Sequence, residues 1–239
     1  MAGDDVVRFV DQDLRGARFT RSLLAGVVMR GVDVSGLDID APWLAGGVLL
    51  VNGVDVAPLV EAELDRRFPG RELRHAVDPD DLRTAWAALE RAWADAVDRV
   101  RAMPADSADV SIDGEWSFAQ TLRHLAFATD AWLGKAILGL PQPFHPFGQP
   151  HAEYETDGFD LSIFAARTPS FAEVLELRAE RQAMVRAFLA SATPQLLDEP
   201  RPAPWSPGSE ESVRNCLHVI FEEEWEHLRF ALRDLAVQG

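Results

Sequence analysis

Two predicted helices carry histidine and glutamate residues that can ligate a metal ion. Glu223 and His227 are four positions apart, so on a helix both project from one face, one turn apart. His124 belongs to an earlier helix and lies on the same face as Ala128 and Ala131. The small side chains of these alanines leave room for another molecule. Two imidazoles and one carboxylate would form a three-ligand site with open positions, as catalytic metal sites do. Because this spacing is common in helices, a solvated helix face remains the alternative.

The acidic run around Glu223 contains a second acid of interest. Glu224 projects near the apolar arc of its helix, which makes it a candidate for a buried acid and for a catalytic role. Glu222 and Glu226 are expected to point more to solvent. Cys216, the only cysteine, is expected to be a small buried hydrophobe rather than a nucleophile. The other histidines are expected to be surface or loop residues without a role: His75, His145, His151 and His218.

Helix start and stop signals define the elements that must position these residues. Asp78-Pro79 supplies an N-cap and a first-turn proline, and Pro104 ends the helix that follows. Two capping boxes open further helices: Ser117 with Gln120, and Ser170 with Glu173. The predicted helices span residues 56–68, 78–103, 117–138, 170–191 and 209–237. The last four predict a mainly α domain, a four-helix bundle with long crossover connections.

Both long connections are rich in proline and carry aromatic residues. Long loops over the end of a bundle often line a site. The connection 141–169 is expected to wall a pocket with four rings: Phe144, Phe147, Tyr154 and Phe159. In the connection 194–208, Arg201 and Trp205 are candidates to meet an anionic or sugar ligand.

The first 55 residues follow a different pattern, with an apolar residue at every fifth position. The series begins at Phe9 and ends at Val54. A period of five fits neither a strand nor a helix, and predicts a coil that turns one corner every five residues. It resembles a short pentapeptide-repeat right-handed β-helix, with glycine-rich loop-and-strand structure as the alternative. The expected domains are therefore 1–55, a helical linker 56–74, and the bundle 75–239.

Composition limits the function further. The chain has 239 residues, with 39 acidic and 23 basic residues and a formal charge of −16, which argues against binding to nucleic acid or anionic membranes. No apolar run is long enough for a membrane span, and the acidic N-terminus does not look like a signal peptide, so a cytoplasmic protein is expected. Residues 1–55 carry only −3 of the charge and are too short to imitate a DNA duplex. Their expected role is to pack against the bundle or to pair with another subunit, as in a homodimer.

Two segments together resemble the DinB-like metalloprotein superfamily. They are Trp116-Ser-Phe-Ala-Gln-Thr-Leu-Arg-His124-Leu and Glu223-Glu-Trp-Glu-His227, and the resemblance covers about residues 75–237. The chain is similar to the branch that contains mycothiol-dependent transferases and maleylpyruvate isomerase. A repeat segment joined to such a bundle resembles a group common in actinobacteria, which fits Lys135 being the only lysine among 23 basic residues.

The resemblance implies a metal site and a reaction class. Its ligands would be His124, Glu223 and His227; most members have histidine at all three positions, whereas the mycothiol branch has histidine, glutamate and histidine. Zinc is the expected divalent metal, with nickel, manganese or iron as alternatives. A low-molecular-weight thiol such as mycothiol, activated as a metal-bound thiolate, would attack a small electrophile in transfer or isomerisation. Two alternatives stay open: a degenerate binding or structural module, and a hydrolase that uses metal-bound water.

Overall fold

The computed structural model describes residues 7–42, 44–206 and 208–238. The chain divides into two compact units, Met1–Ala41 and Pro42–Gly239. In the described part of the chain no helix combines the length and apolar character that crossing a membrane requires.

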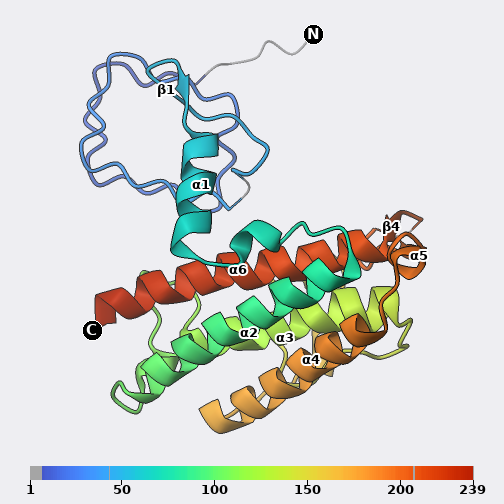
Figure 1. Cartoon of the computed structure of the whole chain (residues 1–239). Coiled ribbons are helices and arrows are strands. Elements are labelled where there is room, and N and C mark those ends of the chain that lie inside the picture. The colour runs from blue at the N-terminus through green and yellow to red at the C-terminus, as the bar shows by residue number, and fades with distance from the viewer. Residues whose placement is uncertain (1–6, 43, 207, 239) are drawn as a thin grey trace. The chain divides into compact units, whose positions relative to one another are not determined.

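The second unit is built around four long helices that lie side by side (Figure 1). They are α2 (Pro79–Arg101), the helix that begins with α3 (Phe118–Thr129), α4 (Phe171–Ser191) and α6 (Val213–Gln238). Contacts of α3 with α4 and α6, and of α2 with α4 and α6, bring the four together. The mainly α architecture expected from the sequence is confirmed.

The capping signals read from the sequence are all present at the helix starts. The Asp78 side chain accepts hydrogen bonds from the next two backbone N–H groups of α2. Ser117 and Gln120 form a reciprocal capping box, with Ser117 N donating to Gln120 Oε1 at 2.9 Å. Ser170 and Glu173 form the same arrangement at α4. Each box satisfies N–H groups that the first turn of a helix leaves without partners.

The helix that begins at Ser117 changes type midway. It is α-helical only through α3 and continues as a π-helix, η3 (Asp130–Ile137). A π-turn holds more residues than an α-turn, so side chains beyond Thr129 are rotated from their α-helical positions. Trp132, which lies in this π-helix, is only half-buried.

The last helix begins later than expected. Residues 209–212 were expected to be helical, but β4 (Glu210–Ser212) pairs antiparallel with β3 (Pro200–Pro202), and a short α5 (Pro194–Leu197) precedes β3 in the chain. The helix starts only at Val213, whose backbone N–H donates to Glu199 O at 3.0 Å. Single-turn 3₁₀ helices, η2 (Ser107–Asp109) and η4 (Leu161–Ile163), lie in the other connections.

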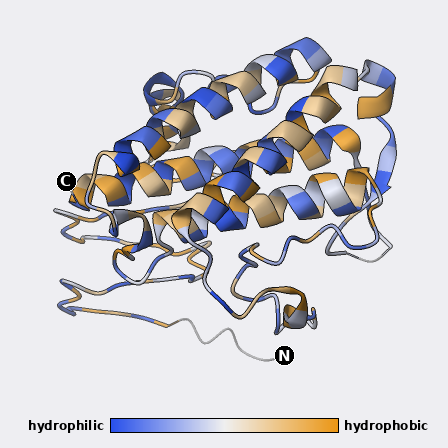
Figure 2. Cartoon of the chain, turned by 90° about the horizontal axis from the view of Figure 1, so that it is seen from below, coloured by the Kyte–Doolittle hydropathy of each residue, from blue (hydrophilic) through white to orange (hydrophobic). Residues whose placement is uncertain are grey.

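The core of the bundle is rich in tryptophan and leucine. Hydrophobic and hydrophilic residues alternate along its helices (Figure 2). Trp86 stacks on Phe221 with ring centroids 5.7 Å apart, which joins α2 to α6. Cys216 is fully buried beside this contact layer, as a small hydrophobe, in agreement with the prediction.

A short segment precedes the bundle within the same unit. β1 (Leu50–Val51) and β2 (Val54–Asp55) form a hairpin around Asn52-Gly53, which both have positive φ, as a two-residue hairpin turn requires. This hairpin lies in the region expected to belong to the repeat. It leads into α1 (Ala57–Arg67) and the 3₁₀ turn η1 (Arg71–Leu73). Gly70 has φ +100°, and a Cβ there would lie 2.4 Å from Ala88 Cβ, so close packing on α2 requires glycine.

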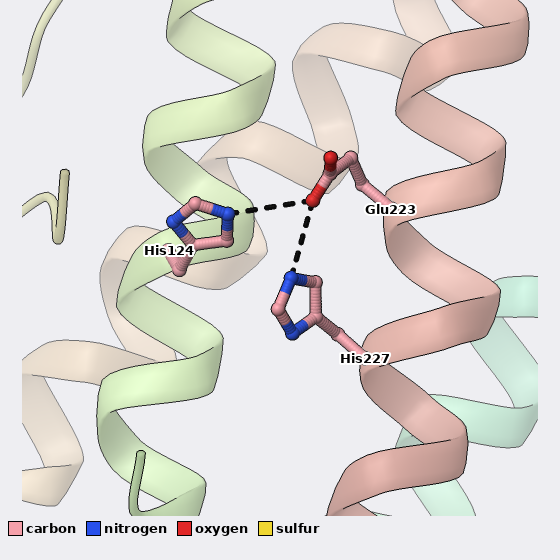
Figure 3. A group of neighbouring side chains, drawn as sticks. All are labelled: His124, Glu223 and His227. Atoms are coloured by element: carbon pink, nitrogen blue, oxygen red, sulfur yellow. Dashed lines mark hydrogen bonds and ion pairs between the residues drawn. The ribbon is translucent and has the colours of Figure 1, made fainter. Parts of the chain in front are cut away.

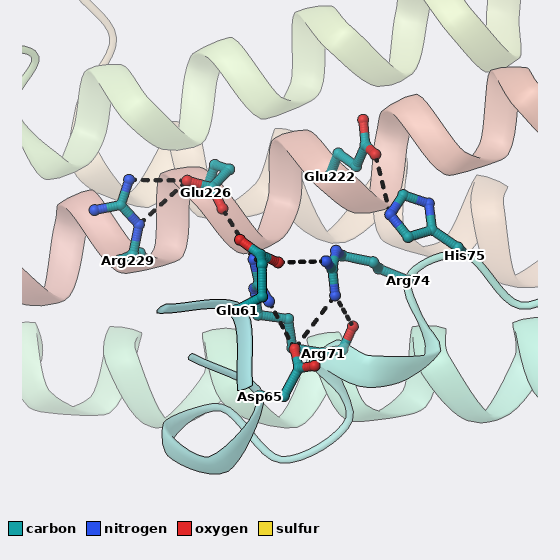
Figure 4. A network of polar contacts seen from close by, with 8 residues as sticks. All are labelled: Glu61, Asp65, Arg71, Arg74, His75, Glu222, Glu226 and Arg229. Atoms are coloured by element: carbon teal, nitrogen blue, oxygen red, sulfur yellow. Dashed lines mark hydrogen bonds and ion pairs between the residues drawn. The ribbon is translucent and has the colours of Figure 1, made fainter. Parts of the chain in front are cut away.

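A network of ion pairs fastens α1 and η1 to α6 (Figure 4). Arg71 is 3% exposed, and its guanidinium lies 2.6 Å from Asp65, 3.0 Å from Glu61 and 3.7 Å from Glu226. Glu222 on the same helix lies 3.4 Å from the exposed His75. Glu222 and Glu226, expected to face solvent, are therefore half-buried against this segment.

The first unit shows a repeat of ten residues. Backbone turns close at 14–17, 24–27 and 34–37, each with a glycine at φ near +77°. Its described residues, 7–41, contain neither helix nor strand. The apolar residues at every fifth position are 45–64% exposed: Phe9, Leu14, Phe19, Leu24, Met29, Val34 and Ile39. A β-helix with an apolar core is therefore not shown.

Candidate metal centre

The three predicted ligands lie together between α3 and α6 (Figure 3). Glu223 Oε2 is 3.3 Å from His124 Nε2 and 3.1 Å from His227 Nε2. One ligand atom from each residue lies within 4.8 Å of the others. Residues from two helices therefore present two nitrogens and one oxygen to a common point.

The contact of the second ring nitrogen of His124 indicates that the space between the three ligand atoms can hold a cation. His124 Nδ1 lies 3.0 Å from the backbone oxygen of Gln149, which can only accept, so Nδ1 carries the proton. In the neutral ring, Nε2 then directs its lone pair at the Glu223 carboxylate. Two electron-rich atoms facing each other favour a cation between them, and a backbone carbonyl behind a metal-ligating histidine is a common supporting contact. The residues present thus fit a divalent metal.

Burial and mutual contact shift the pKa values of two of these groups. Burial alone would raise the pKa of Glu223, but its close contacts with the His124 and His227 rings outweigh burial and hold this pKa well below its usual range. Burial lowers the pKa of His227, against the raising effect of Glu223. A carboxylate and a neutral imidazole are the protonation states that bind metals.

Trp116 packs against both imidazoles. Its ring centroid is 4.5 Å from that of His124 and 5.9 Å from that of His227, nearly parallel to the latter. It lies just before the Ser117 cap, so the start of α3 positions both a ligand and the ring beside it. Trp116 belongs to the segment that carries the family resemblance, but its place beside the ligands was not predicted.

A pocket of about 650 Å³ opens beside the three ligands. His124 and Glu223 belong to its lining, together with Ala128 and Ala131, which leave the room expected from their size. The remaining lining residues are Phe127, Trp132, His151, Glu153, Asp157, Phe159 and Trp205. This volume suits a small organic molecule.

Buried polar contacts hold the proline-rich loop over the pocket. Asp130, at the start of the π-helix, accepts from His145 N at 2.9 Å and from Arg181 Nε at 2.5 Å. Arg123 Nε donates to Phe147 O at 2.8 Å. Burial raises the pKa of Asp130, and hydrogen bonding to Arg181 opposes that shift. These contacts keep the loop where Gln149 reaches His124.

The loop residues expected to wall the pocket divide into three groups. Phe159 lines it directly, and Phe144 and Tyr154 pack on the lining residue Phe127. Trp205 of the second connection, the candidate for contact with a ligand, also lines the pocket. Phe147 does not take part; its ring lies under the Arg167 guanidinium. Polar and aromatic residues on an irregular loop have no period, so the sequence could not tell these groups apart.

Three other expectations also need correction or refinement. His151, expected to be solvated, lines the pocket and lies 3.4 Å from Asp157. Arg201 is not part of the lining and donates to Ile137 O and to Glu199. Glu224 is buried as expected, but it pairs with Arg178 in the core and does not line the pocket. It is therefore poorly placed for the catalytic role considered for it.

Comparison with known families identifies the class of protein. Residues 88–231 match the model of the DinB superfamily, which covers more than half of the chain. The chain belongs to the DinB superfamily, whose members commonly bind metal. No curated protein and no solved structure matches the chain.

Proposed function

We propose that this protein is a divalent-metal-dependent transferase or isomerase that uses a low-molecular-weight thiol, such as mycothiol. The observation that carries the proposal is the two-imidazole, one-carboxylate cluster beside a pocket of about 650 Å³. His124, Glu223 and His227 would hold the metal, with zinc as the expected ion. Three protein ligands leave room for a molecule to bind from the pocket side.

When bound there, a divalent metal would lower the pKa of a thiol and supply a nucleophile at neutral pH. In transfer, the sulfur forms a bond to an electrophilic carbon, the leaving group departs with its electron pair, and the thiol proton goes to solvent. The aromatic wall limits access of water, and Glu223 balances part of the cationic charge. Cys216 takes no part, because burial raises the pKa of its thiol to about 11.

Elemental analysis of the purified full-length chain tests the metal site. About one equivalent of a divalent metal is expected, and His227→Ala should remove most of it while leaving the helical circular dichroism unchanged. The exposed histidine His75 provides the control, since His75→Ala should keep the metal. A folded parent protein without metal affinity would overturn the proposal.

Turnover tests the reaction class. The metal-loaded protein is expected to conjugate a thiol to 1-chloro-2,4-dinitrobenzene faster than the His227→Ala variant does. Ester hydrolysis without any thiol would favour the metal-water hydrolase alternative. Metal binding with neither activity would favour the binding module.

We also propose that the first unit is a pentapeptide-repeat relative that pairs with a second copy of the chain. The support is its five-residue apolar period and the half-exposed side chains at those positions. Light scattering of the full-length protein should then give the mass of a dimer. A monomer across the micromolar range would contradict the pairing.

A further inference from the structure

The pocket beside the metal centre is lined by acidic side chains and by no arginine or lysine among its described lining residues. Two carboxylates of its loop, Glu153 and Asp157, line it in addition to Glu223. Four aromatic side chains line it as well: Phe127, Trp132, Phe159 and Trp205.

Three cationic side chains of adjoining elements are absent from the lining and donate to backbone carbonyl groups. Lys135 Nζ donates to Pro204 O at 2.9 Å, with its ammonium 5.1 Å from the Trp205 ring centroid. Arg123 donates to Phe147 O, and Arg201 to Ile137 O. Lys135 also provides an internal example of a cation held against this aromatic wall.

We infer that the thiol substrate carries hydroxyl or amino groups and lacks carboxylate and phosphate groups. The inference rests on the proposed function and narrows its substrate class. The Glu153 and Asp157 carboxylates accept hydrogen bonds from O–H and N–H donors and attract an ammonium group. The aromatic faces stack on a sugar ring or attract a cation. A second anion would lose its hydration in the pocket and would meet no arginine or lysine among the described lining residues.

Matched thiols with the cobalt-loaded full-length protein test this charge preference. The near-ultraviolet charge-transfer band between sulfur and cobalt reports binding of 2-aminoethanethiol, 2-mercaptoethanol and 3-mercaptopropionate. The ratio of affinities for the amine and the carboxylate is compared between the parent and the double variant Glu153→Gln, Asp157→Asn. This comparison cancels the different acidities of the thiols. The variant should reduce the ratio about fivefold.

A matched control removes the same charge elsewhere. The double variant Glu155→Gln, Glu176→Gln neutralises two exposed carboxylates that do not line the pocket, and should leave the ratio unchanged. Equal ratios in the parent and the pocket variant, or tighter binding of 3-mercaptopropionate than of 2-mercaptoethanol to the parent, would overturn the inference.

A second measurement separates this inference from the proposed function. Absence of the charge-transfer band with every thiol would refute the proposed function alone. Saturation-transfer NMR with 2-phenylethylamine and 3-phenylpropionate on the metal-free protein then decides the charge preference without a thiol. The amine should give the stronger transfer, and Glu153→Gln with Asp157→Asn should abolish the difference. A stronger signal from the carboxylate would contradict the preference.

Discussion

Glu223 and Glu224 are neighbours in the chain, but Glu223 lies at the pocket and Glu224 lies in the core. Glu223 keeps 25% of its side chain exposed and meets His124 and His227 at the pocket. Glu224 is 1% exposed and pairs with Arg178 of α4. The paired charges connect α6 to α4 through the core, next to the position where Glu223 faces α3. A polar contact inside the core thus specifies the rotation of the helix that carries two ligands.

Removing one partner of this pair should be costly. Arg178→Met leaves the buried Glu224 carboxylate without its cation and should lower the free energy of unfolding by about 3–5 kcal/mol. The double variant Arg178→Met, Glu224→Leu removes both charges and should recover most of that loss. Urea unfolding measures both variants. A double variant that is less stable than the single one would show that the charges themselves stabilise the fold.

The protonation of Cys216 should follow its burial. The pKa of about 11, above an ordinary value of 9.0, means that the folded state keeps a proton that the unfolded state releases. Stability should therefore decline as pH rises from about 9 to 11. At pH 8 iodoacetamide should not alkylate the folded protein but should alkylate it fully in urea, as mass spectrometry will show. Equal labelling rates in both states would contradict this placement.

Sequence reasoning could identify the metal cluster because its main cue is local. The i, i+4 spacing places Glu223 and His227 on one face wherever the helix lies, and a family resemblance supplied His124. It could not assign His151 or Trp116 to the site, because neither belongs to a periodic pattern. Their positions depend on how a proline-rich loop and a helix start pack in three dimensions.

At the level of elements, the two capping boxes differ in their surroundings. Ser117 is 3% exposed at the start of the helix that carries His124, whereas Ser170 lies in solvent. Ser117→Ala should lower the free energy of unfolding by about 2 kcal/mol. The substitution removes the acceptor of the Gln120 backbone N–H group, which is partly buried. Ser170→Ala should cost about 0.5 kcal/mol. Chemical denaturation of both variants measures the difference, and equal losses would argue against this effect of burial.

The elements that the sequence analysis missed arise from packing across the chain. The π-turns from Asp130 onward accompany contacts of that aspartate with Arg181 and with the loop at His145. Likewise, Glu210–Ser212 pairs with a strand eight or more residues away instead of extending α6. Local propensity favours an α-helix both at Asp130 and at Glu210–Ser212. The π-helix and the strand depend on tertiary contacts, which the sequence pattern does not show.

For the whole molecule, the two units should respond independently to mutation. Replacing Leu14, Leu24 and Val34 of the first unit by serine should change the unfolding free energy of the second by less than about 0.5 kcal/mol, because these residues are half-exposed. The helical circular dichroism signal follows the second unit alone. The control Leu122→Ala, in the bundle core, should cost about 2–5 kcal/mol. A comparable loss from the serine variant would reveal coupling between the units.

The regular spacing in residues 1–55 predicts a repeat, and turns recur in the described part, but at ten residues instead of five. The period alone does not say whether one chain has enough coils to bury the apolar row. Burial of the apolar row depends on how many coils stack on one another and on whether a second chain covers it. The five-residue spacing specifies neither.

The distance along the chain between the metal ligands also affects folding. His124 and Glu223 are 99 positions apart, so an ion held by both would act as a cross-link that the unfolded chain lacks. At a free metal concentration a hundred times the Kd, this linkage adds about 2.7 kcal/mol to stability. The melting temperature should rise with added metal and fall after chelation. Metal supply in the cell would then govern how long the protein survives proteolysis as well as how fast it works.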